Sequence, residues 1–93
     1  MDKAEFERSL RADGYGEIET KRVAPRTHNH AHDHPFDVKA LVLDGQIALT
    51  VANESRTYRA GDVFTLAAGC KHVEDIGADG VRYIFGRRRA PSA

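Results

Sequence analysis

The sequence predicts an all-β domain, an antiparallel sandwich or barrel preceded by one short N-terminal helix. Residues that favour strands, mainly valine, isoleucine and threonine, recur in short runs from Gly16 onward. Turn residues interrupt these runs about every eight to twelve residues, which is typical of hairpin-rich β folds. The 93 residues are the length of one domain, so we expect a single unit over 1–93. Its expected parts are a helix and turn at 1–15, a barrel at 16–87 and a tail at 88–93.

Composition narrows the classes of function. The chain carries 14 basic and 14 acidic residues, so its formal net charge is zero with the histidines neutral. Binding to nucleic acid or to a membrane surface through bulk charge needs a clear positive excess, so neither partner is expected. No apolar run approaches the ~20 residues that span a bilayer, and the charged start is unlike a signal peptide, which predicts a cytoplasmic protein. The single cysteine, Cys70, excludes an intramolecular disulfide and a four-cysteine zinc site.

The N-terminal helix is predicted over residues 2–12. This segment is rich in good helix formers, and Phe6 and Leu10 stand four positions apart on one helical face. Gly14 follows at the place where a helix commonly ends. A short helix is therefore expected before the strands begin.

Turn signals divide the first half of the β region. Asp44-Gly45 separates two apolar runs and is a strong hairpin signal, so strands at about 36–43 and 46–52 are expected to pair antiparallel. A second turn at 53–55 is expected to return the chain into a strand at 56–59.

The second half contains the same kind of punctuation. Gly61-Asp62 is expected to open a strand at 63–66. Two more strands are predicted at about 71–75 and 81–87, with a loop at 77–80 between them. The arginines from Arg87 onward are expected to form a solvated basic tail.

Histidines form the most distinctive cluster in the chain. Four of the five lie at every second position, and this spacing places them on one face of an extended segment: His28, His30, His32 and His34. Imidazole is the commonest protein ligand for zinc, iron, copper and nickel. Two such histidines can share an ion when a third ligand arrives from elsewhere, and His72 is the candidate. A flexible histidine tract that binds metal weakly is the alternative on these residues alone.

Two stretches of the chain resemble the motifs of the cupin superfamily. The first motif of that family reads HxH, three or four residues, Glu, six residues, Gly, and His32-Asp33-His34 and Gly45 match it here. The second reads G, five residues, PxG, two residues, H, three residues, N, and Gly61, Gly69 and His72 match it at the correct spacings. The resemblance covers about residues 30–86.

The chain departs from these motifs at three positions. Val38 stands where glutamate is usual, Ala67 where proline is usual and Ile76 where asparagine is usual. Without the glutamate, three neutral imidazoles would leave a bound ion its full charge and two or three open positions.

The resemblance implies a conical β-barrel of jelly-roll type that holds a divalent transition metal through His32, His34 and His72. The metal could be iron, manganese, nickel or zinc. An alternative register uses His30 and His32 with Asp37, whose strand parity is opposite to that of His34, so that a bulge would be needed.

Aromatic and aliphatic residues are expected to line the cavity beside the metal, where a small-molecule ligand or substrate would bind: Phe36, Val38, Ala40, Val42, Phe64, Tyr83 and Phe85. Cys70 is expected to share the strand face of His72. The only candidate bases are Asp37, Glu74 and the spare histidines. Two functions stay open: a metal-dependent enzyme (an oxygenase, or an isomerase or lyase) and a non-catalytic module that binds a metal or small molecule. The resemblance and the thin core also favour a homodimer.

Overall fold

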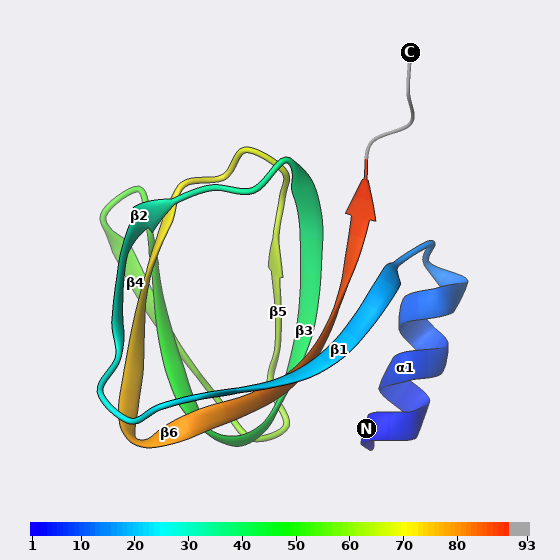
Figure 1. The fold of residues 1–93 in the computed structure, drawn as a ribbon, viewed down its shortest axis with the longest axis horizontal. Coiled ribbons are helices and arrows are strands. Elements are labelled where there is room, and N and C mark those ends of the chain that lie inside the picture. Colours follow the sequence, from blue (N-terminus) through cyan, green and yellow to red (C-terminus); the bar gives the residue numbers. More distant parts are fainter. Residues whose placement is uncertain (90–93) are drawn as a thin grey trace.

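The computed structural model describes residues 1–89, and it confirms the predicted all-β fold with one short helix. The elements in chain order are α1 (Lys3–Ala12), β1 (Gly16–Val23), β2 (His28–His32), β3 (Phe36–Val51), β4 (Glu54–Arg59), β5 (Val63–Leu66) and β6 (His72–Arg89). The strands form one antiparallel sheet in the order β1-β6-β3-β4, with β2 also paired to β6 and β5 to β3. Figure 1 shows the strands curving around a closed outline, with α1 outside it beside β1.

Helix α1 begins and ends where the sequence predicts. The Asp2 side chain caps it by accepting a hydrogen bond from the Glu5 amide at 2.8 Å. Phe6 and Leu10 are buried, and they pack in a small apolar cluster with residues of β3 and β6. Gly14 has a φ of 83° and turns the chain into β1.

The two long strands, β3 and β6, overturn part of the strand prediction. The expected hairpin at Asp44-Gly45 is wrong, because β3 continues through this dipeptide and both of its halves pair with β6. The expected loop at 77–80 is wrong for the same reason, since β6 runs unbroken through it.

Glycines explain why these strands bend instead of reversing. Gly45 pairs with Val81, the residue after Gly80, and the two glycines have φ values of 75° and 78°. A side chain at Gly45 would place its Cβ 1.9 Å from the Gly80 carbonyl oxygen, so the two backbones approach too closely for any other residue. The register shifts beside Gly45, as expected at a β-bulge. Both strands therefore fold over together.

The shorter elements follow the turn signals. Ala52 and Asn53 have φ values of 50° and 68° and connect β3 to β4 in a tight hairpin. The Asp62 carboxylate accepts a hydrogen bond from the Arg59 amide at 2.8 Å, and β5 follows over the predicted residues.

The C-terminal arginines differ from the prediction. The basic tail expected from Arg87 onward is wrong as far as Arg89, because β6 continues to that residue and pairs with the start of β3. The rest of the expected tail lies outside the described residues.

The main core fills the space between the two halves of the folded sheet, and its members come mostly from β3 and β6: Val38, Ala40, Val42, Ile47, Leu49, Phe64, Leu66, Ile76, Val81, Tyr83 and Phe85. His72 is the one buried polar residue of the described chain, with 1% of its surface exposed. No helix within residues 1–89 is long and apolar enough to cross a membrane.

Candidate metal centre

Three histidines meet at one end of the barrel. His32 ends β2, His72 begins β6 directly opposite it, and His34 lies in the segment that leads into β3. One ring nitrogen from each lies within 4.8 Å of the others. The ring of His72 is 4.3 Å from that of His32 and 5.3 Å from that of His34, measured between centroids. These are the three residues that the sequence singled out as a metal site.

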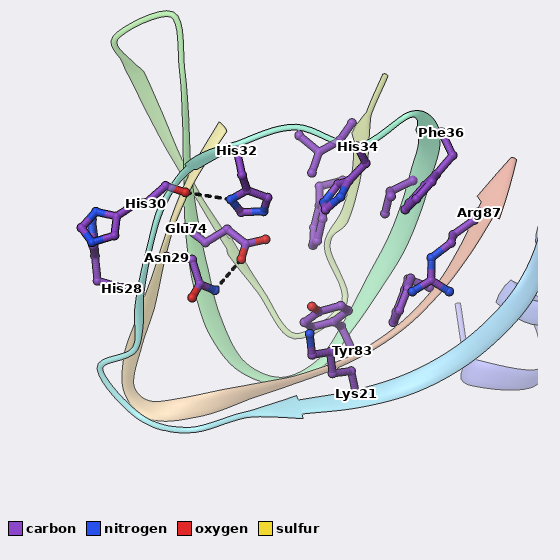
Figure 2. A pocket seen from close by; sticks show the side chains of 14 residues that line it. Lys21, His28, Asn29, His30, His32, His34, Phe36, Glu74, Tyr83 and Arg87 are labelled. Atoms are coloured by element: carbon purple, nitrogen blue, oxygen red, sulfur yellow. Dashed lines mark hydrogen bonds between the residues drawn. The ribbon is translucent and has the colours of Figure 1, made fainter. Parts of the chain in front are cut away.

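The expectation that all four clustered histidines share one face is wrong. The pairing of β2 with β6 shifts register between Asn29 and His32, so the alternation of inward and outward side chains is broken there. His28 and His30 are exposed and pack edge to face on each other, whereas Asn29 and His32 are partly buried. Figure 2 shows His28 and His30 on the far side of β2 from the His32 ring.

Backbone carbonyls fix the orientation of two imidazoles. Nδ1 of His72 lies 3.0 Å from the Cys70 carbonyl oxygen, and Nδ1 of His32 lies 2.7 Å from the His30 carbonyl oxygen. Because a carbonyl oxygen only accepts, each Nδ1 carries the proton and each Nε2 keeps its lone pair for another partner. In metal sites, the ring nitrogen that does not bind the metal commonly donates a hydrogen bond of this kind, and this bond orients the ring.

The Nε2 atom of His72 is fully buried and has no hydrogen-bond partner among residues 1–89. An unpaired buried polar atom costs about 1–3 kcal/mol, so folded proteins seldom leave one without a reason. A metal ion among the three rings would satisfy this lone pair. The residues present therefore fit a metal.

His34 is prepared for the same role by its surroundings. Burial lowers its pKa, and the neighbouring His32 and His72 lower it further. Its ring stacks on Phe36 at 5.1 Å, and its carbonyl oxygen accepts a hydrogen bond from the Gly69 amide at 2.8 Å. A depressed pKa keeps the imidazole neutral, which is the form that binds metals.

The carboxylate of the alternative register lies elsewhere. Asp37 accepts a hydrogen bond from the Ala68 amide at 2.8 Å and pairs with Arg88, and these contacts lower its pKa. The structure brings neither Asp37 nor His30 into the group of three ring nitrogens. Val38, at the motif's glutamate position, is buried in the core.

Glu74 lies beside the site, although the sequence suggested it only as one of several candidate bases. Its Oε2 atom is 3.8 Å from Nε2 of His72, and its Oε1 atom accepts a hydrogen bond from the Asn29 side chain at 2.7 Å. Strand parity was the available signal, since Glu74 is two positions after His72 and shares its face.

A cavity of about 440 Å³ opens onto His32 and His34, while His72 lies buried behind them. Five of the seven residues expected to line it do so: Phe36, Val38, Phe64, Tyr83 and Phe85. The other two, Ala40 and Val42, belong to the core beneath. Lys21 and Arg87 complete the wall opposite the histidines (Figure 2). Arg87 lies over the Phe85 ring at 4.9 Å and bonds to Glu19 at 3.2 Å, so it is not the solvated residue that we expected. This volume suits a small molecule with apolar parts.

Cys70 precedes β6 and contributes its backbone to the site. Its carbonyl oxygen holds His72, and its partly buried side chain packs against the core. The position therefore has a structural role through its main chain.

No protein-family profile matches the sequence, and no curated protein matches it significantly. Solved structures do match. A protein of unknown function from Rhizobium leguminosarum is 18% identical with a TM-score of 0.74, covering 78% of this chain and 69% of its own. A cupin superfamily protein from Desulfitobacterium hafniense is 16% identical (TM-score 0.69, coverage 78% and 66%). A cupin-2 domain protein from Shewanella frigidimarina is 16% identical (TM-score 0.66, coverage 77% and 69%). At this identity the likeness is one of fold, and the chain spans about two thirds of each neighbour's length.

Proposed function

We propose that this chain, which has the cupin fold, binds one divalent transition-metal ion through His32, His34 and His72 and is a metal-dependent enzyme acting on a small molecule. The observation that carries the proposal is the buried Nε2 atom of His72, which has no hydrogen-bond partner in residues 1–89 and faces two further imidazoles. A metal ion bound among the three rings would satisfy this lone pair.

An ion held by three neutral imidazoles would act as a Lewis acid or, as iron(II), as a redox centre. The chain supplies the rest. The carbonyl oxygens of Cys70 and His30 orient two of the rings. Phe36 and Val38 give the cavity an apolar wall on the side of β3.

The cavity favours catalysis over simple metal storage. Its volume is about 440 Å³, and His32 and His34 line it, so a ligand in it would lie beside an ion bound to these two residues. Tyr83 adds a hydroxyl group that can donate a proton to that ligand.

The test begins with elemental analysis of protein purified without a histidine tag. We expect close to one equivalent of iron, manganese, nickel or zinc, lost in His72→Ala and retained in His28→Ala. His28 is the matched control because it is an exposed histidine that pairs with Asp75. An equal loss of bound metal in both variants would favour a flexible histidine tract that binds metal weakly.

A second measurement separates an enzyme from a binding module. Metal-loaded protein is screened with small acids, thiols and diketones for product formation and oxygen uptake. Turnover that disappears in His72→Ala supports the enzyme. Saturable binding of a small molecule, with no product whichever metal is loaded, would instead indicate a non-catalytic binding module.

The expected homodimer remains a prediction, and light scattering on the purified chain tests it.

A further inference from the structure

Glu74 occupies a position that three neutral histidines leave unfilled. Its side chain is 16% exposed and enters the cavity from β6, and Figure 2 shows the carboxylate pointing inward below the His32 ring. The 3.8 Å between its Oε2 and the Nε2 of His72 is too long for a hydrogen bond. Two ligands that each lie about 2.0–2.2 Å from one ion are separated by up to about 4 Å, so the spacing fits two atoms that share a metal.

Asn29 holds this carboxylate in place. It lies directly opposite Glu74 in the pairing of β2 with β6, and its amide donates a hydrogen bond to Oε1 at 2.7 Å. The register shift that follows Asn29 turns both Asn29 and His32 inward. One irregularity of β2 therefore positions a metal ligand and the residue that fixes the carboxylate.

The other carboxylates near the histidines are paired with other groups or are exposed to solvent. Asp37 is bound to Ala68 and Arg88, Asp75 pairs with His28, and Asp33 is exposed. Glu74 is the only acidic residue among those that line the cavity in the described part of the chain.

We propose that Glu74 supplies the carboxylate of the metal centre, in place of the glutamate that the motif has at position 38, and that Asn29 positions it. This inference rests on the proposed metal binding by the three histidines. The closely spaced group comprises the histidine nitrogens alone, so the flexible glutamate side chain must complete the approach. The carboxylate would reduce the charge of the centre from +2 to +1 and occupy one of its open positions.

The experiment measures cobalt(II) affinity by competition with a chelator, together with the visible spectrum of the cobalt form. Glu74→Gln preserves the shape of the side chain and its acceptor for Asn29 but removes the charge. We expect it to weaken cobalt binding by about 10–100-fold, to change the spectrum, and to increase the affinity of the cobalt form for azide. Asn29→Ala should change affinity and spectrum in the same direction but less.

Asp75→Asn is the matched control, because it removes a neighbouring carboxylate outside the cavity and should match the unmodified protein. Wild-type affinity, spectrum and azide binding in Glu74→Gln would overturn this inference and leave the three-histidine site intact. Failure of the unmodified protein to bind cobalt would instead refute the proposed function. If Glu74→Gln does not fold, a wild-type cobalt spectrum in Asn29→Ala overturns the inference.

Discussion

Replacement of His72 by alanine separates the contribution of the metal from that of packing. His72 is 1% exposed and joins the start of β6 to the histidines of the opposite segment. In metal-free protein, truncation of a buried ring costs about 3 kcal/mol. The variant also lacks the unpaired Nε2 atom, and this increases its free energy of unfolding by about 1–3 kcal/mol. The free energy of unfolding of the metal-free variant should therefore be lower than that of the metal-free wild type by only about 0–2 kcal/mol.

With metal present, the expected difference is much larger. A ligand at 100 times its dissociation constant stabilises the folded state by about 2.7 kcal/mol. For a domain of this size, each 1 kcal/mol changes the melting temperature by roughly 4–8 °C. The wild-type protein should therefore melt about 10–20 °C higher with metal than with chelator, and His72→Ala should lose this difference.

The assay is thermal unfolding followed by circular dichroism, in chelator and in excess zinc, for wild type, His72→Ala and His28→Ala. His28→Ala should keep the full difference between the two conditions, since its ring lies outside the group of three. A wild-type difference in His72→Ala, or an equal response of all three proteins to zinc, would refute a metal centre at His72.

Three further outcomes are expected. The lowered pKa of Asp37, caused by the Ala68 amide and by Arg88, gives stability that is present above about pH 4 and is lost as the pH falls through the folded-state pKa. As the pH falls below about 4, the free energy of unfolding of Asp37→Asn should therefore decrease less steeply than that of the exposed control Asp79→Asn. Burial and Glu74 raise the pKa of Tyr83 to about 12, so its stabilising effect is complete below about pH 10 and is lost as the pH rises through 12. In a pH titration of metal-free protein followed by ultraviolet absorbance, one of the three tyrosines should ionise at higher pH than the other two. This late ionisation should be absent in Tyr83→Phe. Gly45→Ala should destabilise by about 2–5 kcal/mol in denaturant unfolding because its Cβ meets the Gly80 carbonyl, whereas Gly61→Ala has open space and should cost about 1 kcal/mol.

The features that the sequence predicted correctly depend on local chemistry. The helix with its apolar pair Phe6 and Leu10, its end at Gly14, and the turn expected near residue 53 are each decided by a few neighbouring residues. The meeting of His32, His34 and His72 was implied by a motif spacing that belongs to a known barrel.

The errors share a different cause. A left-handed glycine after aspartate permits both a hairpin and a bent strand, so Asp44-Gly45 does not distinguish them. The choice is made by pairing with β6, whose Gly80 carbonyl oxygen lies where a Cβ at position 45 would stand. That partner lies far along the chain, beyond the reach of any local pattern.

The register shift in β2 explains both the excluded histidines and the site of the carboxylate. Without the shift, His28 and His30 would share the face of His32, and Asn29 would turn outward. With it, Asn29 meets Glu74 on the inner face, and His32 meets His72. Because β2 pairs with β6 and with no other strand of the described chain, these contacts are its main attachment to the barrel. An ion shared by His32 and His72 would therefore stabilise the pairing of β2 with β6 more than any other part of the fold.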